Sequence, residues 1–322
     1  MVRFRVALMF AVLFGGISVC TFAASPTPSE RNEAKPETPN GNEFVLTGKD
    51  FLTTDGVQLT GSYYSGRDDK DTIPVVLLHG QGRDRTEFDS LIPELQKNGY
   101  AVLVPDLRGH GKSTKRMPQP PKQGQVPPGV ITNSPQVKPV DYLMDSFVRK
   151  DYEDMIRYDL APFDKFLVKG NNAEKLNLNK LVVIGIDMGG TLGASWAVKR
   201  PKQTKSLIVI SPNFDSVIKG YVKNRKSFTD PEMTQICILV GETDTESHEH
   251  AVDLKNEILG KLKDDEISTY ESKVPLFTFA TDKHGGGMLA TEKLEIPQKI
   301  CEYIEYRFSK FKPKDTPWKK QQ

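Results

Sequence analysis

The chain has 322 residues, of which 37% are hydrophobic, and its formal net charge at pH 7 is only +2. A chain of this length can bury a large core, and about 250–280 residues is an ordinary size for one α/β domain. The small net charge argues against nucleic acid or another strongly charged partner. Lysines gather near the C-terminus, where we expect a frayed, solvated basic tail over residues 312–322.

Residues 1–24 predict an export signal. Two arginines precede an apolar run from Val6 to Val19, and small residues follow the run. This order is typical of a secretory signal peptide, and the run is too short for a comfortable membrane span. We therefore expect an exported protein, periplasmic or secreted, with no stable membrane span after the signal is removed. A lipid anchor at Cys20 is disfavoured because Val19 is bulkier than lipoprotein processing usually accepts.

Residues 25–43 predict a disordered linker, because they are rich in proline, glutamate and serine and show no apolar periodicity. The ordered domain is expected over residues 44–311. Within it, residues 116–140 form an insertion that is dense in proline and also lacks an apolar period. The insertion leaves the carboxyl end of a predicted strand, where ligands enter such folds. We expect either a partly ordered flap over the site or a disordered excursion.

Short runs of β-branched and aliphatic residues alternate with helical patterns throughout the domain. The expected strands are 44–52 and 57–64, which form an antiparallel hairpin, and 74–78, 100–104, 181–185, 206–211, 236–240 and 276–280. The expected helices are 84–98, 141–168 with a bend at Pro162, 191–200, 246–262 and 291–311. This alternation predicts an α/β fold, a mostly parallel eight-stranded sheet with helices on both faces.

The rest of the chain is organised around residues 181–200. A buried strand runs into a Gly-Ile-Asp-Met-Gly turn at residues 185–189, and a helix follows that Pro201 ends. A strand that reverses directly into a helix needs a very tight turn, so glycines are expected on both sides of the central residue. We expect Asp187 at the carboxyl end of the sheet, over the positive end of the following helix.

From residue 44 to about residue 311 the chain resembles the α/β-hydrolase fold superfamily. The resemblance rests on five motifs: HGQG at 79–82, PDLRGHGKS at 105–113, GIDMGG at 185–190, GETD at 241–244 and DKHGGG at 282–287. It implies that Asp187 takes the place of the nucleophile, Asp244 that of the acid and His284 that of the base. The backbone N–H groups of Gln81 and Met188 would form the oxyanion hole.

An aspartate at the nucleophile position changes the chemistry that the resemblance implies, since the family usually has serine there. A carboxylate needs no base to activate it, so Asp187 would attack an sp³ carbon that bears a leaving group. The product is an ester of its own side chain. His284, held by Asp244 or by the alternative acid Asp215, would then activate the water that hydrolyses this ester. Haloalkane dehalogenases and epoxide hydrolases also place aspartate at this position.

The chain departs from those two families at several places. Met188 stands where they usually have tryptophan, and residues 212–235 are too few for their helical cap. Tyr142 and Tyr221 are candidate tyrosines for the site. We therefore predict a hydrolase with an Asp187-Asp244-His284 site that acts on a small ester, epoxide or halide-type substrate. The alternative is a catalytically inactive homologue that serves as a binding module.

Neither a cofactor nor a metal is expected. His248 and His250 are two residues apart, so they do not share one face of a helix as metal ligands. Cys237 and Cys301 are interpreted as small core residues rather than a disulfide. The histidines of the HGQG and PDLRGHGKS motifs are interpreted as scaffold. A small-molecule substrate is the expected partner, nucleic acid is not, and the sequence predicts no particular oligomeric state.

Overall fold

The structure is a computed structural model that describes residues 43–117, 138–213, 234–259, 274–309 and 316–322. All of these residues belong to one compact unit, Pro39–Gln322. The predicted signal peptide, nearly all of the predicted linker and residues 118–137 of the proline-rich insertion lie outside the described residues.

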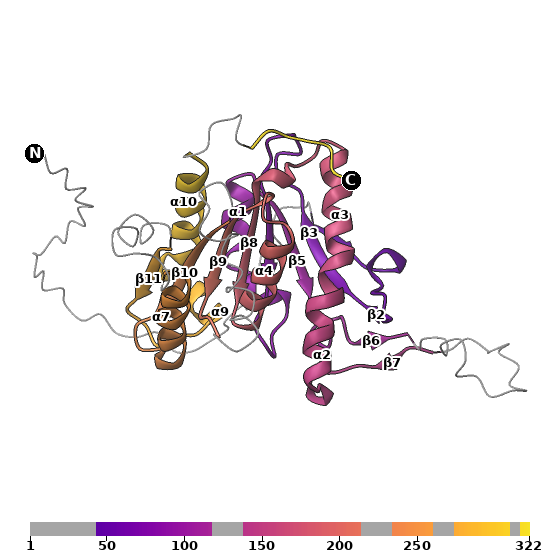
Figure 1. Cartoon of the computed structure of the whole chain (residues 1–322), viewed down its shortest axis with the longest axis horizontal. Coiled ribbons are helices and arrows are strands. Elements are labelled where there is room, and N and C mark those ends of the chain that lie inside the picture. Colours follow the sequence, from indigo (N-terminus) through magenta and orange to yellow (C-terminus); the bar gives the residue numbers. More distant parts are fainter. Residues whose placement is uncertain (1–42, 118–137, 214–233, 260–273, 310–315) are drawn as a thin grey trace, which may run out of the picture. The chain divides into compact units, whose positions relative to one another are not determined.

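Eight strands form the main sheet in the order β1-β3-β5-β4-β8-β9-β10-β11 (Figure 1). Their bounds are Glu43–Leu46 (β1), Thr60–Tyr64 (β3), Ala101–Asp106 (β5), Pro74–Leu78 (β4), Leu181–Ile186 (β8), Thr204–Ile210 (β9), Gln235–Gly241 (β10) and Leu276–Phe279 (β11). The pairs β1–β3 and β3–β5 are antiparallel, and every further pair from β5 to β11 is parallel. The predicted mostly parallel eight-stranded sheet is therefore confirmed.

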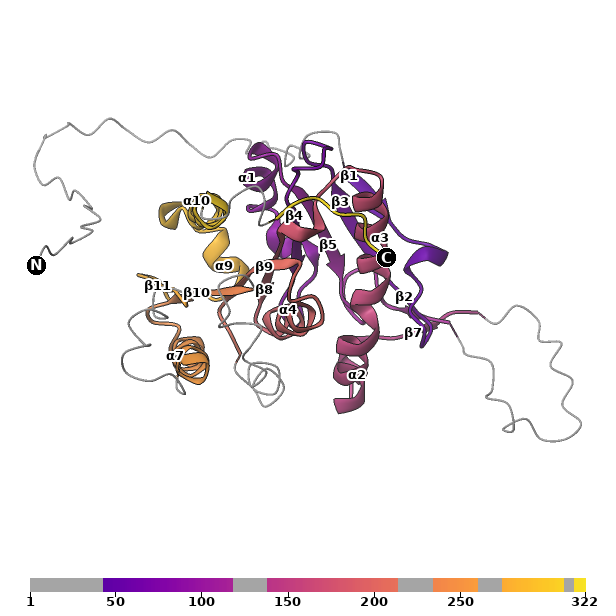
Figure 2. The same cartoon turned by 45° about the horizontal axis from the view of Figure 1, so that its top comes forward.

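Helices cover both faces of this sheet. Because side chains alternate along a strand, Val76 and Leu78 of β4 face one core and Val75 and Leu77 face the other. The first core contains residues of α3 (Leu160–Asn172), α4 (Met188–Lys199) and α7 (Thr245–Leu259). The second contains residues of α1 (Ile92–Lys97), α9 (Gly286–Leu289) and α10 (Ile296–Ser309). Figure 2 shows α1 and α10 on one side of the strands and α4 and α7 on the other.

Several predicted elements are broken into shorter pieces. The predicted helix 84–98 consists of a 3₁₀ turn, η2 (Arg85–Phe88), and α1, which has Pro93 in its first turn where proline is tolerated. The first predicted strand ends at Leu46, and a 3₁₀ turn, η1 (Lys49–Phe51), replaces its second half after Gly48 at φ +87°. The hairpin partner β3 nevertheless pairs with β1 as predicted, with Phe44 opposite Tyr63.

The predicted long helix 141–168 is also divided. It comprises a 3₁₀ turn η3 (Met144–Ser146), α2 (Arg149–Asp154), the π-helical turn η4 (Met155–Asp159) and α3. The irregularity therefore precedes the predicted bend, because Pro162 stands in the first turn of α3. The predicted helix 291–311 begins with the 3₁₀ turn η6 (Glu292–Leu294), and α10 starts only at Ile296.

A small second sheet fastens the two ends of the insertion. Strands β2 (Val57–Gln58), β6 (Lys115–Arg116) and β7 (Val140–Asp141) pair antiparallel in that order. Residues 116 and 140, the predicted limits of the insertion, are therefore paired directly. The 3₁₀ turn η3 (Met144–Ser146) and then α2 (Arg149–Asp154) follow β7 along the chain.

The turn after β5 is anchored by a buried ion pair. The side chain of Arg108 is fully buried; its Nε donates to Asp159 Oδ1 at 2.7 Å and its Nη1 donates to Asp55 Oδ2 at 2.8 Å. The Arg108 backbone N–H also donates to Asp159 Oδ2 at 3.0 Å. A buried guanidinium needs such partners, because an unpaired charge in the interior is costly. These bonds fix the end of η4 against the turn and so set the position of α2.

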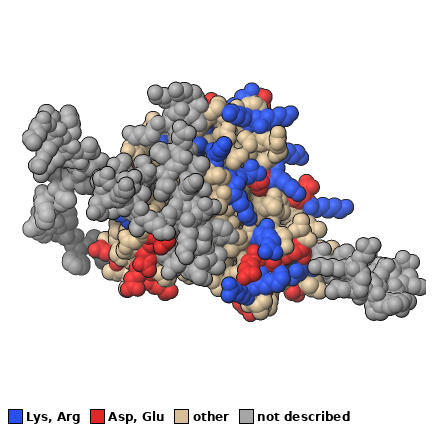
Figure 3. All heavy atoms as spheres, viewed as in Figure 1, with Lys and Arg blue, Asp and Glu red and all other residues tan. Residues whose placement is uncertain are grey.

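Charges are mixed on the face shown in Figure 3, where basic and acidic side chains lie side by side over α2 and α3. Exposed ion pairs such as Arg149 with Glu153 contribute to this pattern.

Cys237 of β10 and Cys301 of α10 are both buried free thiols, as predicted. None of the helices that the structure describes is both long and apolar enough to cross a bilayer.

Residues 316–322 pack onto the connection between α3 and β8. Four asparagine side chains donate Nδ2–H groups to backbone carbonyls of this segment at 2.6–3.1 Å: Asn171 to Lys319, Asn172 to Gln321, Asn177 to Thr316 and Asn179 to Pro317. The indole of Trp318 donates back to the Asn171 carbonyl at 3.1 Å. The predicted frayed basic tail is therefore wrong for residues 316–322, because side-chain amides satisfy the backbone that a frayed end leaves to water.

Removing residues 316–322 should lower the free energy of unfolding by about 1–3 kcal/mol. Each bond contributes about 1 kcal/mol net, and the entropy of ordering the segment offsets part of the sum. Urea unfolding of the truncated chain measures the effect, and Lys320→Ala is the matched control because that side chain is exposed. Equal midpoints for the truncated and the full chain would contradict the role assigned to the asparagines.

Candidate active site

Asp187 occupies the turn between β8 and α4 with a backbone that L-residues rarely adopt, at φ +47° and ψ −115°. The turn is tight because α4 starts against the backbone of β4. A Cβ on Gly189 would lie 1.9 Å from the Leu78 carbonyl oxygen, and a Cβ on Gly185 would lie 2.3 Å from the Gly189 carbonyl oxygen. Both glycines are therefore required by space, as the motif predicts.

The carboxylate of Asp187 does not cap the helix that it precedes. An aspartate at this position usually accepts from an amide in the first turn, but the structure gives Asp187 no such bond. Its Oδ2 instead accepts from the backbone N–H of Gln81 at 3.3 Å. Met188 is the first residue of α4, so its N–H has no partner within the helix. The predicted oxyanion donor Gln81 and the predicted nucleophile are therefore brought together.

Replacing Asp187 with glycine should stabilise the fold relative to replacing it with alanine, by about 1 kcal/mol. Strained φ/ψ values cost about 1–3 kcal/mol in a residue with a Cβ, and the larger entropy of glycine in the unfolded chain offsets part of the gain. Denaturant unfolding of Asp187→Gly and Asp187→Ala measures the difference. If Asp187→Ala were the more stable variant, the turn would not be strained.

His79, the first residue of the HGQG motif, holds this loop from inside the core. Its side chain is fully buried; Nδ1–H donates to the Gly80 carbonyl at 2.8 Å, and Nε2 accepts from the Leu107 N–H at 3.0 Å. Burial lowers the pKa of His79 to about 4. The ring is therefore neutral at pH 7, and its two bonds require the tautomer with hydrogen on Nδ1.

His110 supports the other end of the same loop. Its Nδ1–H donates to the Arg108 carbonyl at 2.7 Å and its Nε2 accepts from the Gly82 N–H at 3.1 Å. Burial lowers the pKa of His110 as well. The two rings thus fix the residues on either side of Gln81, in accordance with the scaffold role that the sequence predicts.

Stability should fall below pH 6.5 because of His79. The unfolded chain takes up the proton near pH 6.5 and the folded chain only near pH 4, so the stability from neutral His79 is complete above 6.5 and is lost towards 4. A difference of about 2.5 in pKa corresponds to about 3 kcal/mol. Urea unfolding between pH 7 and 4.5 measures the fall, which should be smaller in His79→Asn than in the control His250→Asn. Equal slopes would exclude His79 as the cause.

The structure also brings the predicted base and acid together. His284 Nδ1 lies 2.9 Å from Asp244 Oδ2 and 3.0 Å from Ser247 Oγ, so both oxygens are within hydrogen-bond distance of the same nitrogen. The Asp244 side chain is 12% exposed and that of His284 is 53% exposed. Ser247 was not identified from the sequence, since a serine in the first turn of a helix carries no signal for this contact. The alternative acid Asp215 lies outside the described residues.

A cavity of about 230 Å³ opens beside Asp187. Most of its surface is apolar. Its lining residues come from the HGQG loop, α2, η4, the start of α4 and the segment after β9: Gln81, Tyr152, Met155, Ile156, Asp187, Met188, Thr191, Leu192 and Asn213. His284 is not among them. Tyr152, Met155 and Ile156, from the chain between β7 and β8, contribute to the lining instead.

Tyr152 is the site residue that the sequence analysis missed. Its Oη accepts from Gln81 Nε2 at 3.2 Å, beside the carboxylate of Asp187. The predicted candidate Tyr142 instead hydrogen-bonds to Asp151 and does not line the cavity, and Tyr221 lies outside the described residues. No sequence signal distinguished Tyr152, because its position depends on the break in the predicted long helix.

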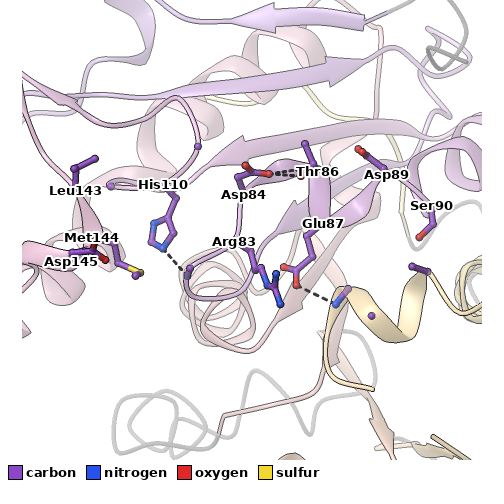
Figure 4. Close-up of a pocket in the computed structure, with 16 residues that line it drawn as sticks. Arg83, Asp84, Thr86, Glu87, Asp89, Ser90, His110, Leu143, Met144 and Asp145 are labelled. Carbon is purple, nitrogen blue, oxygen red and sulfur yellow. Dashed lines mark hydrogen bonds between the residues drawn. The ribbon is translucent and has the colours of Figure 1, made fainter. Parts of the chain in front are cut away.

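A larger cavity, of about 790 Å³, is lined by Gly82 of the HGQG loop and by residues that follow it (Figure 4). Polar side chains line much of it, among them Arg83, Asp84, Glu87 and His110, and neither Asp187 nor His284 reaches it. We therefore place the candidate active site at the smaller cavity. In the parts of the chain that the structure describes, no three His, Cys, Asp or Glu side chains gather to hold a metal ion.

Comparisons with known proteins agree with this architecture. The family model described as the alpha/beta hydrolase fold matches residues 73–233, half of the chain. An sn-1-specific diacylglycerol lipase, ABHD11, of Danio rerio is 28% identical over 191 residues, which cover 57% of this chain and 47% of that protein. A haloalkane dehalogenase of Mycobacterium marinum is 37% identical over 75 residues, or 23% of this chain and 25% of that protein.

The chain thus spans about half, or less, of the curated relatives that it matches. Among solved structures, an esterase from Pyrococcus furiosus superposes with a TM-score of 0.53 at 18% identity, covering 82% of this chain and 90% of that chain. At this identity the likeness shows a shared fold alone. The family match and the geometry of the Asp187 turn support one conclusion: this chain belongs to the alpha/beta hydrolase fold family.

Proposed function

We propose that this protein is an exported hydrolase that acts on a small, largely apolar epoxide through an ester of Asp187. The observation that carries the proposal is the bond from the Gln81 N–H to Asp187 Oδ2. It occupies one carboxylate oxygen with an oxyanion-hole donor and leaves Oδ1 for attack. A purely structural aspartate at the start of α4 would cap the helix, and Asp187 does not.

In the first step Asp187 Oδ1 attacks a ring carbon of the epoxide, and the C–O bond of the ring breaks. The hydroxyl of Tyr152 accepts from Gln81, so its own hydrogen is available to the oxygen that leaves. Proton transfer from Tyr152 gives the hydroxyl of the ester intermediate. This role for a tyrosine favours an epoxide over a haloalkane, whose leaving halide needs no proton.

In the second step His284 acts as a base on water. Asp244 accepts the Nδ1 hydrogen, which leaves Nε2 free to take a proton from the water. The hydroxide adds to the carboxyl carbon of the Asp187 ester, and the Gln81 and Met188 N–H groups stabilise the oxyanion. When the alkyl oxygen leaves, His284 returns the proton to it. The acid so formed on Asp187 re-protonates Tyr152, and the sum is epoxide plus water giving a diol.

The cavity limits the size and the polarity of the substrate. Its volume of about 230 Å³ is below the range of about 300–1,000 Å³ that drug-sized ligands occupy. Met155, Ile156 and Leu192 supply an apolar wall, and no lysine or arginine lines it. A small neutral molecule therefore fits better than a phosphorylated or carboxylated one. Small esters and haloalkanes are the other substrates to be tested.

A binding protein without catalysis is the second candidate. It is favoured by one observation, the exposure of His284 and its absence from the lining of the cavity. In that case Asp187 would hold a ligand through its charge and no covalent intermediate would form. The two candidates therefore differ in whether Asp187 is ever esterified.

Replacing His284 with glutamine should trap the intermediate. Attack by Asp187 needs no base, so the ester should form and accumulate while turnover falls by about a hundredfold or more. The variant is incubated with a panel of small epoxides, esters and haloalkanes, and intact-mass spectrometry is followed by peptide mapping. A gain equal to the mass of the added epoxide should map to the peptide that contains Asp187.

The controls separate the candidates. The double variant Asp187→Asn, His284→Gln should show no adduct, and His250→Gln should turn over normally because that histidine lies on α7 and has no contact with the site. An adduct on another residue would exclude the Asp187 mechanism. A wild type that is inactive on the whole panel, with no adduct in His284→Gln, would favour the binding protein.

A further inference from the structure

The geometry points to Glu87 as a positioning residue that holds two loops together. One is the HGQG loop (residues 79–82), called the oxyanion loop because it contains the donor Gln81, and the other is the His284 loop (residues 282–287). This inference rests on the proposed function for its catalytic meaning. Glu87 lies in η2, and neither its sequence position nor any motif marks it as a site residue. Figure 4 shows its side chain pointing from η2 to the start of α9.

One carboxylate accepts from two loops that are distant in sequence. Glu87 Oε2 accepts from the Gly80 N–H at 2.8 Å, and Oε1 accepts from the Gly286 N–H at 3.1 Å. Gly80 immediately precedes Gln81, whose N–H reaches Asp187. Gly286 follows His284 by two residues. The bridge therefore connects the backbone beside the oxyanion donor to the backbone beside the base.

The glycine-rich turn after His284 leaves room for the Glu87 side chain. A Cβ on Gly286 would lie 2.4 Å from Glu87 Cγ, so a larger residue in the glycine-rich turn would displace the bridge. Both bonds go to an ionised acceptor, which makes them stronger than bonds between neutral groups. Two oxygens are needed, since each takes a different amide.

Ser211 connects the turn after His284 to the turn that holds Asp187. Its Oγ accepts from the Gly285 N–H at 2.9 Å, and the preceding residue, Ile210, accepts from the Asp187 N–H at 3.1 Å. Ser211 adopts φ +46°, a strained value for a residue other than glycine. The turn after His284 is thus held by two successive amides, one bound to Ser211 and one to Glu87. Ser211 fixes the turn to the sheet, and Glu87 fixes it to the oxyanion loop.

The bridge matters because the proposed reaction uses both loops in the second step. The Gln81 N–H must point at the carboxyl oxygen of Asp187 while His284 delivers hydroxide to the same carboxyl carbon. Errors of about 1 Å in such placement cost about a hundredfold in rate. Glu87 touches neither substrate nor reacting atoms, so it acts by position alone.

The test combines amide hydrogen exchange with kinetics, on the full chain. In Glu87→Ala both bonds are lost, and in Glu87→Gln one is lost because an amide offers a single oxygen acceptor. By NMR, the amides of Gly80 and Gly286 should both exchange at least tenfold faster in Glu87→Ala. The Leu107 amide, held by His79, should keep its rate. Asp89→Asn is the matched control, since Asp89 lines the same cavity and is exposed.

In Glu87→Ala we also expect kcat for a small epoxide to fall tenfold or more and KM to change less than threefold, with Glu87→Gln intermediate. Unchanged exchange at either glycine would overturn the bridge. Faster exchange at both glycines with unchanged kcat would overturn the positioning role. If wild type hydrolyses nothing, the proposed function fails, and the exchange rates still decide whether Glu87 joins the two loops.

Discussion

The site depends on the close approach of α4 to β4. The helix starts so near the sheet that the Gly189 backbone leaves no space for a Cβ beside the Leu78 carbonyl. This contact forces the strained backbone of Asp187 and directs its side chain out of the helix axis toward the HGQG loop. Such strain persists only where the surroundings over-determine it, and here two buried parallel strands and a buried helix do so.

The neighbouring loops are held by groups that cannot take part in the reaction. The buried, neutral rings of His79 and His110 fix the oxyanion loop, and the carboxylate of Glu87, which lines the larger cavity, also binds it. The charged partners of Arg108 fix the segment that carries Tyr152. These side chains act largely on backbone amides of the loops, so the loops are held without direct bonds to the proposed reacting atoms.

Much of this arrangement could be predicted from the sequence, because it follows from periodicity and turn chemistry. The parallel sheet, the Asp187 turn and the proximity of His284 to Asp244 each depend on residues at strand ends, where motifs are short and local. Tyr152 and Glu87 could not be predicted. Tyr152 lies in α2, just before the π-helical turn that divides the predicted helix, and Glu87 acts through amides of glycines 7 and 199 residues away. Neither kind of contact leaves a periodic pattern.

The asparagine contacts of residues 316–322 have a consequence for the order of folding. The bond from Asn177 to Thr316 joins residues 139 positions apart, and the loop that it closes contains Asp187, Asp244 and His284. Closing so long a loop is entropically unfavourable, so it is expected late in folding, after the strands within the loop have paired. The contact that closes this loop is therefore expected to form after the strands that carry the proposed catalytic residues have paired, so it completes the fold and does not nucleate it.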